Sequence, residues 1–520
     1  MEPMSFRQML LNCADRFGDR IAIRDQKSAY TYAQLVKAVE VCSDKLKALG
    51  VKQDAHVALW SYNSADWLIA FFGIIQARGI PVLFNYSLTL GELSSMFRYT
   101  DVRYIVHGEN RETKRNPTAA AELAAYAGLS QTAVYDIRMS DYGREAEYVR
   151  IVEPGTDNTD CSRRRSDFIL FTTGTTGQAK AVQISQVSFL MDSVEIVDAL
   201  PEFEKRHIHF CLGSPLFHVL GLEMAIGNLF FGATIEIPSN FSADTLLDLF
   251  SEQHIDFMAA TGAAYISMIR NPRFGRVAVC CPKYCLAGGG TVTPAQFMRL
   301  ESLFGHTIFL NDYGQTEIGS TLTRIRPTDR VEKRLNSVGR PFRHKHVEIM
   351  DEGRRILPAG EKGEVVVKDD GNLMLGYYKL PEEQVIDEDG WLHTGDLGFL
   401  DKEGYLYLSG RIKDIIIKGG ENISPREVEA ALSRNEGVLE AKVFGAPHSI
   451  WGESIEACVV PSDKEAFDEQ KLKASLAKMI APFKIPSHIF CYESFPLNAN
   501  GKLNQRALKA SMLERLAEEK

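Results

Sequence analysis

The sequence predicts an α/β protein with a large N-terminal domain, whose parallel-rich sheets are flanked by helices, and a smaller α+β domain at the C-terminus. A chain of 520 residues is too long for one hydrophobic core. Through its first two thirds, apolar strands alternate with amphipathic helices, which is typical of a parallel sheet covered on both faces. Other patterns begin near residues 335 and 410, so we expect domains at 1–410 and 411–520, with a β subdomain at about 335–410.

The first 110 residues show the alternation most clearly. Hydrophobic spacing and turn residues predict helices at residues 5–18, 33–49, 65–77 and 90–99. Short apolar runs between them predict strands at residues 21–24, 56–60, 80–84 and 104–107. Thr31 and Gln34 form a capping box that begins the second helix, and Gly50 stands where a helix commonly ends.

A polar stretch interrupts the alternation before it resumes. Residues 109–165 contain an Ala-rich helix at 118–127, and we expect a surface excursion that leads into a strand at 168–172. The later strands are expected at residues 182–185, 208–212, 234–237, 257–260 and 307–310. The later helices are expected at residues 189–199, 243–253 and 294–304, and Ser242 is the expected N-cap of the second of these.

Two changes of pattern define the rest of the chain. Short strands with Asp-Gly and Glu-Gly turns replace the helices and predict the β subdomain, with strands at residues 347–350, 364–368 and 404–408. An apolar strand at 415–417 then precedes Ser424-Pro-Arg-Glu427, which predicts a helix with a Ser N-cap, Pro at N1 and Glu at N3. This helix belongs to the predicted C-terminal domain.

Composition limits the classes of function. The formal net charge of −9 argues against a nucleic-acid-binding protein that works by neutralising phosphates. The nine cysteines are scattered, and only Cys281 and Cys285 approach ligand spacing, which favours buried free thiols in a reducing compartment. No basic and apolar leader is present, and the densest apolar run, residues 67–75, is too short to span a membrane. We therefore expect a cytoplasmic protein without a transmembrane segment.

A run of glycines and threonines at residues 171–180, Phe-Thr-Thr-Gly-Thr-Thr-Gly-Gln-Ala-Lys, predicts a loop that grips phosphate. Glycine lets the backbone approach a ligand, successive N–H groups in such a turn form a concave anion site, and threonine hydroxyls add donors. A flexible surface loop could have the same composition. The run is not a Walker P-loop, because Ala179 stands where that motif requires Gly.

Further motifs follow this loop in a fixed order over about 330 residues. They are Tyr313-Gly-Gln-Thr-Glu317, Trp391-Leu-His-Thr-Gly-Asp396, Gly410-Arg-Ile-Lys-Asp414, Lys418-Gly-Gly420 and Asn498-Ala-Asn-Gly-Lys-Leu503. With this ordered set, the chain resembles the acyl-adenylate-forming superfamily of acyl-CoA synthetases, peptide-synthetase adenylation domains and luciferases. The chain departs from the family's usual residues at Ala179, Ala181, Gln186 and Asn504, and none of these removes a group that the chemistry needs.

The resemblance assigns residues to the phosphates and the adenine of ATP. The loop would contact the β- and γ-phosphates, and its assigned residues are Thr172, Thr173, Gly174, Thr175, Thr176, Gly177 and Lys180. Tyr313 would lie on or beside adenine, and its neighbours Asp312 and Gly314 are expected to bind the nucleotide as well.

The resemblance also assigns residues to the metal and the ribose. Thr316 would contact the α-phosphate, and Glu317 would help to hold Mg²⁺, a hard cation that prefers carboxylate and phosphate oxygens. Asp396 would bind the ribose hydroxyls, Arg411 would close over the ribose, and Lys413 occupies the family's hinge position.

A catalytic lysine and a path for the acceptor follow from the same resemblance. Lys502 would bridge the two anions that meet when a carboxylate attacks the α-phosphate. The smaller domain is expected to be mobile: it would turn between the half-reactions and withdraw Lys502. That turn would bring Lys418, Gly419 and Gly420 to the active site, where glycines would let the pantetheine arm pass.

The acyl pocket is expected near His218, which resembles the family's aromatic gate, and near Gly288 and Gly289. Adenylation domains for α-amino acids carry an aspartate at the gate, so His218 and its apolar neighbours favour an apolar acid. Taken alone, each residue has a plainer interpretation: His218 as a structural histidine, Glu317 as a solvated carboxylate and Lys502 as a lysine at the tip of a turn.

The predicted reaction has two halves. A carboxylate attacks ATP and displaces pyrophosphate to give acyl-AMP, and CoA then attacks the acyl carbonyl while AMP leaves. We expect a fatty acid as substrate, CoA as acceptor and a monomer or homodimer. The alternatives are an aryl acid, a carrier-protein pantetheine in place of CoA, and an inactive homologue that only binds nucleotide.

Overall fold

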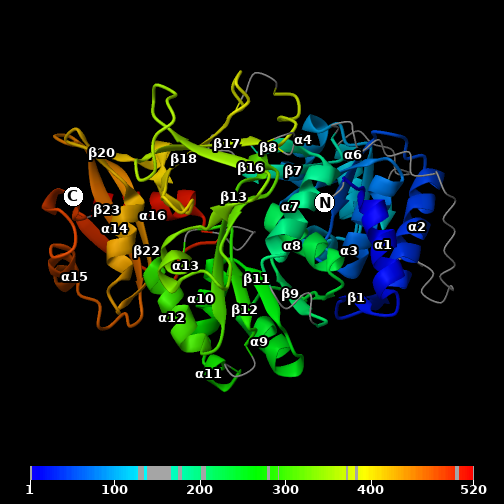
Figure 1. The fold of residues 1–520 in the computed structure, drawn as a ribbon, viewed down its shortest axis with the longest axis horizontal. Coiled ribbons are helices and arrows are strands. Elements are labelled where there is room, and N and C mark those ends of the chain that lie inside the picture. The colour runs from blue at the N-terminus through cyan, green and yellow to red at the C-terminus, as the bar shows by residue number, and fades with distance from the viewer. Residues whose placement is uncertain are drawn as a thin grey trace.

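The computed structural model describes residues 3–126, 134–136, 166–173, 179–200, 206–277, 281–290, 292–369, 373–380, 385–497 and 503–518. Within these residues the chain forms four β-sheets with helices packed against them (Figure 1). Two large sheets and a four-stranded sheet come from the chain up to Arg411, and a five-stranded sheet comes from the residues after it. The predicted α/β fold class is confirmed.

The first large sheet has six strands in the order β6-β5-β3-β4-β7-β8. Their bounds are β3 (His56–Trp60), β4 (Ile80–Leu83), β5 (Tyr104–His107), β6 (Val134–Asp136), β7 (Phe168–Thr173) and β8 (Ala179–Ile184). Neighbouring strands run parallel except β7 and β8, which are antiparallel, because the few residues between them cannot make a parallel crossover. The helices of this region are α1 (Phe6–Phe17), α2 (Tyr32–Ala48), α3 (Ala65–Gln76), α4 (Leu90–Tyr99), α5 (Arg111–Arg115) and α6 (Ala119–Tyr126).

The second large sheet has nine strands in the order β15-β14-β13-β12-β11-β9-β10-β1-β2. Their bounds are β1 (Ile21–Arg24), β2 (Ala29–Thr31), β9 (His209–Gly213), β10 (Thr234–Glu236), β11 (Phe257–Ala260), β12 (Tyr284–Ala287), β13 (Ile308–Gly314), β14 (Thr321–Arg324) and β15 (Arg340–Pro341). The strands from β13 to β1 are parallel, and antiparallel strands close both edges. The helices are α7 (Gln186–Val197), α8 (Val219–Phe230), α9 (Ala243–Glu252), α10 (Gly262–Arg270), α11 (Phe274–Val277), α12 (Pro294–Phe304) and α13 (Val331–Asn336).

The two large sheets share one hydrophobic core. Buried side chains of β3 and β9 belong to the same cluster as those of α1, α2, α3, α7 and α8, so these helices form a layer between the sheets (Figure 1). Phe6, Phe71, Phe72 and Phe168 pack ring against ring inside it, with centroids 5.4 to 6.4 Å apart. This common core fixes the sheets relative to each other and therefore fixes the strand ends that carry the motifs.

The rest of the chain forms two smaller sheets. The four-stranded sheet is antiparallel, with β16 (Lys345–Met350), β17 (Gly363–Asp369), β18 (Leu392–Leu400) and β19 (Leu406–Arg411). The strands of the C-terminal sheet are β20 (Ile416–Lys418), β21 (Glu421–Ile423), β22 (Val438–His448), β23 (Gly452–Pro461) and β24 (His488–Cys491). Its helices are α14 (Pro425–Ser433), α15 (Glu469–Leu476) and α16 (Gln505–Glu518).

Helices cover both faces of the C-terminal sheet. Along β23, Ile455, Ala457 and Val459 join one apolar cluster with α14 and α15, whereas Cys458 and Val460 join another with α16. This alternation follows from the two-residue period of a strand. Both clusters consist of residues after Arg411, so this part of the molecule has its own interior.

Several local predictions can be compared with the structure. Thr31 and Gln34 form the expected capping box, and Ser242 caps α9. The helix at Ser424 begins as predicted, but the Ser424 hydroxyl makes no cap bond and instead donates to the carbonyl of Ser409. The predicted helix at 118–127 is α6, and most of the expected excursion around it lies outside the described residues.

The described cysteines and helices also bear on the sequence predictions. The seven cysteines in the described residues are free thiols, and all but Cys491 are buried; Cys161 and Cys280 lie outside those residues. Among the helices that the structure describes, none is both long and apolar enough to cross a bilayer.

Candidate active site

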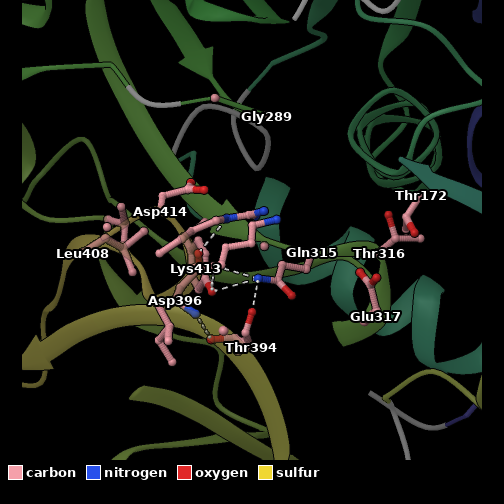
Figure 2. A pocket seen from close by; sticks show the side chains of 18 of the residues that line it. Thr172, Gly289, Gln315, Thr316, Glu317, Thr394, Asp396, Leu408, Lys413 and Asp414 are labelled. Atoms are coloured by element: carbon pink, nitrogen blue, oxygen red, sulfur yellow. Dashed lines mark hydrogen bonds and ion pairs between the residues drawn. The ribbon is translucent and has the colours of Figure 1, made fainter. Parts of the chain in front are cut away.

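A pocket of about 710 Å³ brings together segments that are far apart in the sequence. It lies at the carboxyl ends of β7, β12 and β13, where open α/β sheets usually bind their ligands, and β18, η5 (Ile412–Asp414) and α14 border its other side. Figure 2 shows three corners of this pocket: Asp396 with Lys413, Thr316 and Glu317 with Thr172, and Gly289.

The first corner is organised around the Asp396 carboxylate, which is 5% exposed. Tyr313 donates its hydroxyl to Asp396 Oδ2 at 2.6 Å, and Gln315 donates Nε2 to the same oxygen at 2.7 Å. Arg411 Nε donates to Oδ1 at 2.9 Å, because β18 and β19 pair with Asp396 opposite Arg411. Gln315 also donates to the carbonyl of Thr394 at 3.0 Å. A carboxylate held by three donors is a rigid acceptor site.

Burial and neighbouring charges shift the pKa values of three side chains in this corner. Burial and the charge of Asp396 raise the pKa of Tyr313 well above its usual value, so the phenol stays protonated and donates. Burial lowers the pKa of Arg411, but the charge of Asp396 raises it to a net value above normal. Burial and the neighbouring Arg411 charge lower the pKa of Lys413. The corner therefore presents the cations of Arg411 and Lys413 beside the paired Asp396 carboxylate.

The second corner carries groups suited to phosphate and a divalent cation. Thr172 and Lys180 lie opposite each other on β7 and β8, and the Lys180 ammonium lies 4.8 Å from the centre of the Tyr377 ring. Tyr377 in turn donates its hydroxyl to Glu317 Oε1 at 2.9 Å. Thr316 and Glu317 belong to the short 3₁₀ helix η4 (Thr316–Ile318), which directly follows β13.

The donor set fits Mg²⁺ bound together with nucleotide. Glu317 offers a carboxylate and Thr316 a hydroxyl, and both side chains project into the pocket from neighbouring positions (Figure 2). Within the described residues, no group of three His, Cys, Asp or Glu side chains could hold a metal alone. Mg²⁺ is usually held by one or two carboxylates together with substrate phosphates, and this corner could supply the protein's share.

The third corner is formed by small and apolar residues. Gly289 marks this corner (Figure 2), and Gly290, Val219, Val292 and His218 also line the pocket. Gly288 leaves room for its neighbours, because a Cβ there would lie 2.7 Å from Asp312 Oδ1 and 3.0 Å from a methyl group of Leu220, and these side chains would have to shift.

Asp312 faces this third corner. On β13, Tyr313 reaches Asp396, whereas its neighbour Asp312 lies against Gly288 and 3.4 Å from the Thr321 hydroxyl. The opposite directions follow from the strand's two-residue period. The Asp312 carboxylate is therefore a polar group beside small and apolar residues.

Two family models together match most of the chain. The model described as AMP-binding enzyme matches residues 10–378, and the model described as AMP-binding enzyme C-terminal domain matches residues 427–502. The chain belongs to the AMP-binding enzyme family. This confirms the predicted superfamily and the prediction of an enzyme of the adenylate-forming acid–thiol ligase class.

Curated members of the AMP-binding enzyme family are similar over nearly their full length. An oxalate–CoA ligase of Arabidopsis thaliana is 28% identical over 99% of this chain and 100% of its own. A feruloyl-CoA synthase of Amycolatopsis is 29% identical, covering 93% and 94%. A long-chain-fatty-acid–CoA ligase of Mycobacterium tuberculosis is 28% identical, covering 92% of each. The acids in these names differ widely.

Solved structures of the family share the fold. ATP-bound MatB from Rhodopseudomonas palustris matches with a TM-score of 0.82 and 24% identity, covering 98% of this chain and 99% of that one. An anthranilate–CoA ligase in complex with anthranoyl-AMP matches with a TM-score of 0.84 and 20% identity, covering 98% and 97%.

Most residues that the family resemblance assigned lie at the pocket. The lining includes Thr172, Lys180, His218, Gly289, Asp312, Tyr313, Gly314, Thr316, Glu317, Asp396, Arg411 and Lys413. Gly174, Thr175, Thr176, Gly177, Lys502 and the side chain of Thr173 lie outside the described residues.

The segment assigned to the pantetheine arm lies elsewhere in this structure. Lys418 Nζ donates to the carbonyl of Phe483 at 3.1 Å, and the Gly419 amide donates to the carbonyl of Trp451 at 2.8 Å. Instead, the C-terminal domain contributes Arg426, Glu429, Lys442 and Gln505 to the described pocket wall.

Sequence reasoning missed several pocket residues. Gln315 lies between two assigned residues, so its position inside the AMP-binding motif was the signal that could have found it. Tyr377 reaches Glu317 across 60 residues of sequence, and nothing in its local sequence marks it. Arg426 follows Pro425 in the first turn of α14, where it could be taken for an ordinary surface residue.

Proposed function

We propose that the protein activates a carboxylic acid with ATP to give acyl-AMP and pyrophosphate, and then transfers the acyl group to the thiol of CoA. The observation that carries this proposal is one pocket in which Asp396, Tyr313 and Arg411 lie at one corner and Thr316, Glu317 and Lys180 at another. The first set suits a ribose and an adenine, and the second suits a phosphate chain. The family's named CoA ligases support the same reaction class.

In the first half-reaction, a carboxylate oxygen forms a bond to the α-phosphorus of ATP. The bond from that phosphorus to the bridging oxygen breaks, and pyrophosphate leaves with the electron pair. Thr316 is proposed to contact the α-phosphate, and Lys180 to hold the leaving phosphates. Mg²⁺ held by Glu317 would neutralise charge on the phosphates.

Lys502 is proposed to bridge the attacking carboxylate and the α-phosphate. It lies outside the described residues, and its support is that Gln505, three residues later in the chain, lines the pocket. The pocket also receives Arg426 and Lys442 from the same domain, so basic side chains of that domain border the proposed ATP site. We propose domains at 1–410 and 411–520 that reorient before the second half-reaction.

In the second half-reaction, the thiol of CoA gives up its proton to water, and its sulfur forms a bond to the acyl carbonyl carbon. The bond from that carbon to the phosphate oxygen breaks, and AMP leaves. Lys418, Gly419 and Gly420 are proposed to line the thiol's path after the domain has turned.

For the acid, we propose a fatty acid, with an aryl acid as the second candidate. His218 beside Gly289, Val219 and Val292 supports an apolar acyl group. The Asp312 carboxylate favours including hydroxylated acids in any panel.

The test is ATP–pyrophosphate exchange across fatty, aryl, dicarboxylic and hydroxylated acids, followed by acyl transfer to CoA and to a holo-carrier protein. We expect exchange with at least one acid and thioester formation with CoA. Transfer to the carrier protein alone would identify the carrier-loading alternative. Exchange with no acid would contradict the proposal and favour a protein that only binds nucleotide.

A further inference from the structure

A buried cluster of charged side chains lies behind the wall of the pocket that carries Thr316 and Glu317. Asp192, Lys345 and Asp369 have fully buried side chains, and Lys345 Nζ lies 3.1 Å from a carboxylate oxygen of each aspartate. His344 Nε2 lies 2.6 Å from the other oxygen of Asp192. Buried charges are costly unless they are well paired, and apolar side chains could fill the same volume. We therefore expect the cluster to have a role beyond packing.

The two basic groups of the cluster, Lys345 and His344, are held in their charged forms. Burial lowers the pKa of Lys345, but Asp192 and Asp369 raise it to a net value above normal. Burial likewise lowers the pKa of His344, but hydrogen bonds to Asp192 and Glu195 raise it to about 9. Lys345 therefore acts as a fixed cation with directed N–H donors.

Two of the cluster's hydrogen bonds reach the backbone segment that carries Glu317. Lys345 Nζ donates to the carbonyl of Ile318 at 3.0 Å, and the Ser320 hydroxyl donates to Asp192 Oδ2 at 2.8 Å. These bonds lie on either side of Gly319, whose φ of +95° ends the short helix η4. The segment that presents Thr316 and Glu317 is thus anchored immediately after its last helical residue.

The cluster also connects this segment to the phosphate hairpin, the antiparallel pair of strands β7 and β8 that carries Thr172 and Lys180. Asp192 lies on α7, which begins at Gln186 directly after β8, the strand that carries Lys180. The Asp192 carboxylate therefore links the helix behind the hairpin to the segment that holds Glu317. Any movement of α7 relative to η4 would break charged hydrogen bonds inside the core, which is costly.

We propose that Lys345, Asp192 and Ser320 are positioning residues for Glu317, and that they hold its carboxylate at the separation from the phosphate hairpin that a metal–ATP complex requires. The inference rests on the proposed role of Glu317 as a metal ligand. Hydrogen-bonded groups behind a metal ligand commonly set its affinity, and their loss costs about 10- to 100-fold in binding or activity.

The sharpest test compares Ser320→Ala with Ser193→Ala. Both serines are buried, but the Ser193 hydroxyl donates to the carbonyl of Phe189 within α7, and among the described residues it makes no hydrogen bond to Lys345, to the Asp192 carboxylate or to Ser320. Mn²⁺ binding in the presence of ATP is followed by electron paramagnetic resonance, and ATP binding in EDTA by calorimetry. We expect Ser320→Ala to weaken Mn²⁺ binding about tenfold while ATP binding in EDTA stays unchanged, and Ser193→Ala to match the wild type.

A second pair of variants tests the cation itself. Lys345→Met should weaken Mn²⁺ binding at least as much as Ser320→Ala, and Lys345→Arg should restore part of the affinity. If Lys345→Met fails to fold, the serine pair decides alone. Folded Ser320→Ala protein with unchanged Mn²⁺ binding, or with equal loss of ATP binding in EDTA, would overturn the proposal. These measurements need no acid substrate, so a failed pyrophosphate exchange would overturn the proposed function without touching this result.

Discussion

At the scale of single residues, the Asp396 carboxylate is bound by three side-chain donors in the pocket. It accepts from Tyr313, Gln315 and Arg411, so its charge is compensated before any ligand binds. Hydroxyl groups of a ribose would have to share these oxygens or replace one of the donors. Arg411, whose side chain is about half exposed, is the donor that can move most easily.

Asp396→Asn should weaken ATP binding by about tenfold or more, because hydrogen bonds to a charged group contribute roughly 1.5–3 kcal/mol. Calorimetric titration with ATP measures this. Asp414→Asn is the matched control, since Asp414 also lines the pocket but is exposed. Equal affinity in the two variants would contradict a ribose-binding role for Asp396.

Glu223 has the most unusual protonation among the described carboxyl groups near the pocket. Burial raises its pKa from 4.5 to about 8, and the charges of Asp192 and Asp312 add to the shift. Between these two values the folded protein holds a proton that the unfolded chain releases. The contribution of Glu223 to stability therefore falls as the pH rises from 4.5 through 8.

Glu223→Gln should remove this pH dependence, because glutamine does not titrate and keeps a similar shape. Between about pH 5.5 and pH 7.5, the wild type should lose on the order of 2 kcal/mol more stability than the variant. Urea unfolding at the two pH values measures the difference. Parallel losses in both proteins would show that Glu223 is not the group that titrates.

At the scale of elements, the segment 373–380 connects two parts of the pocket. It runs beside β8, where Tyr377 pairs with Val182, and its next residue, Tyr378, donates a hydrogen bond to Asp101 at 2.7 Å. Tyr377 points the other way and reaches Glu317. One extended segment thus supports the phosphate hairpin and the proposed metal ligand at the same time.

Tyr377→Phe should raise the Mg²⁺ concentration needed for half-maximal pyrophosphate exchange several-fold, because Glu317 loses a hydrogen bond worth about 1 kcal/mol. Tyr378→Phe removes a hydroxyl of the same kind one residue away and should leave that concentration unchanged. If both variants shift it equally, the segment acts through stability and not through Glu317.

At this scale, the sequence could predict features that depend on neighbouring residues, but not those that depend on contacts between distant parts of the chain. The capping box at Thr31 and the start of α14 depend on neighbours within four residues, so the local sequence was sufficient. The antiparallel direction of β8 was not predicted, because it depends on which strand it pairs with. Lys345 and Asp192 lie 153 residues apart and escaped notice because only the folded core brings them together. The motifs identified many of the residues that line the pocket. They did not identify Tyr377 or the charged cluster behind η4.

At the scale of the whole molecule, the described contacts between the C-terminal domain and α10 and α12 include several bonds from side chains to carbonyl groups. Gln296 donates to Leu439, Arg299 to Glu436 and Arg270 to Glu493, at 2.9, 3.4 and 2.9 Å. Polar contacts of this kind are typical of surfaces that separate and re-form. They support the proposed turn of the domain.

Gln296→Glu should slow pyrophosphate exchange several-fold and leave thiolysis of supplied acyl-AMP unchanged. The variant keeps the oxygen that caps α12 through Thr293 but removes the donor to Leu439. A lost hydrogen bond of about 1 kcal/mol sets the size of the effect. Measuring both half-reactions separately checks it, and equal slowing of the two would contradict a role in the first orientation alone.

The separate interior of the C-terminal domain has a consequence for how the chain can be divided. The apolar clusters on both faces of its sheet contain only residues after Arg411. Expressing the chain as two separate proteins divided after Arg411 should therefore expose little apolar surface on either one. The residues after Arg411 can then be replaced as a unit by the corresponding residues of a relative. Grafting them between relatives would swap the machinery that alternates between the two chemical steps while leaving the choice of acid with the larger part.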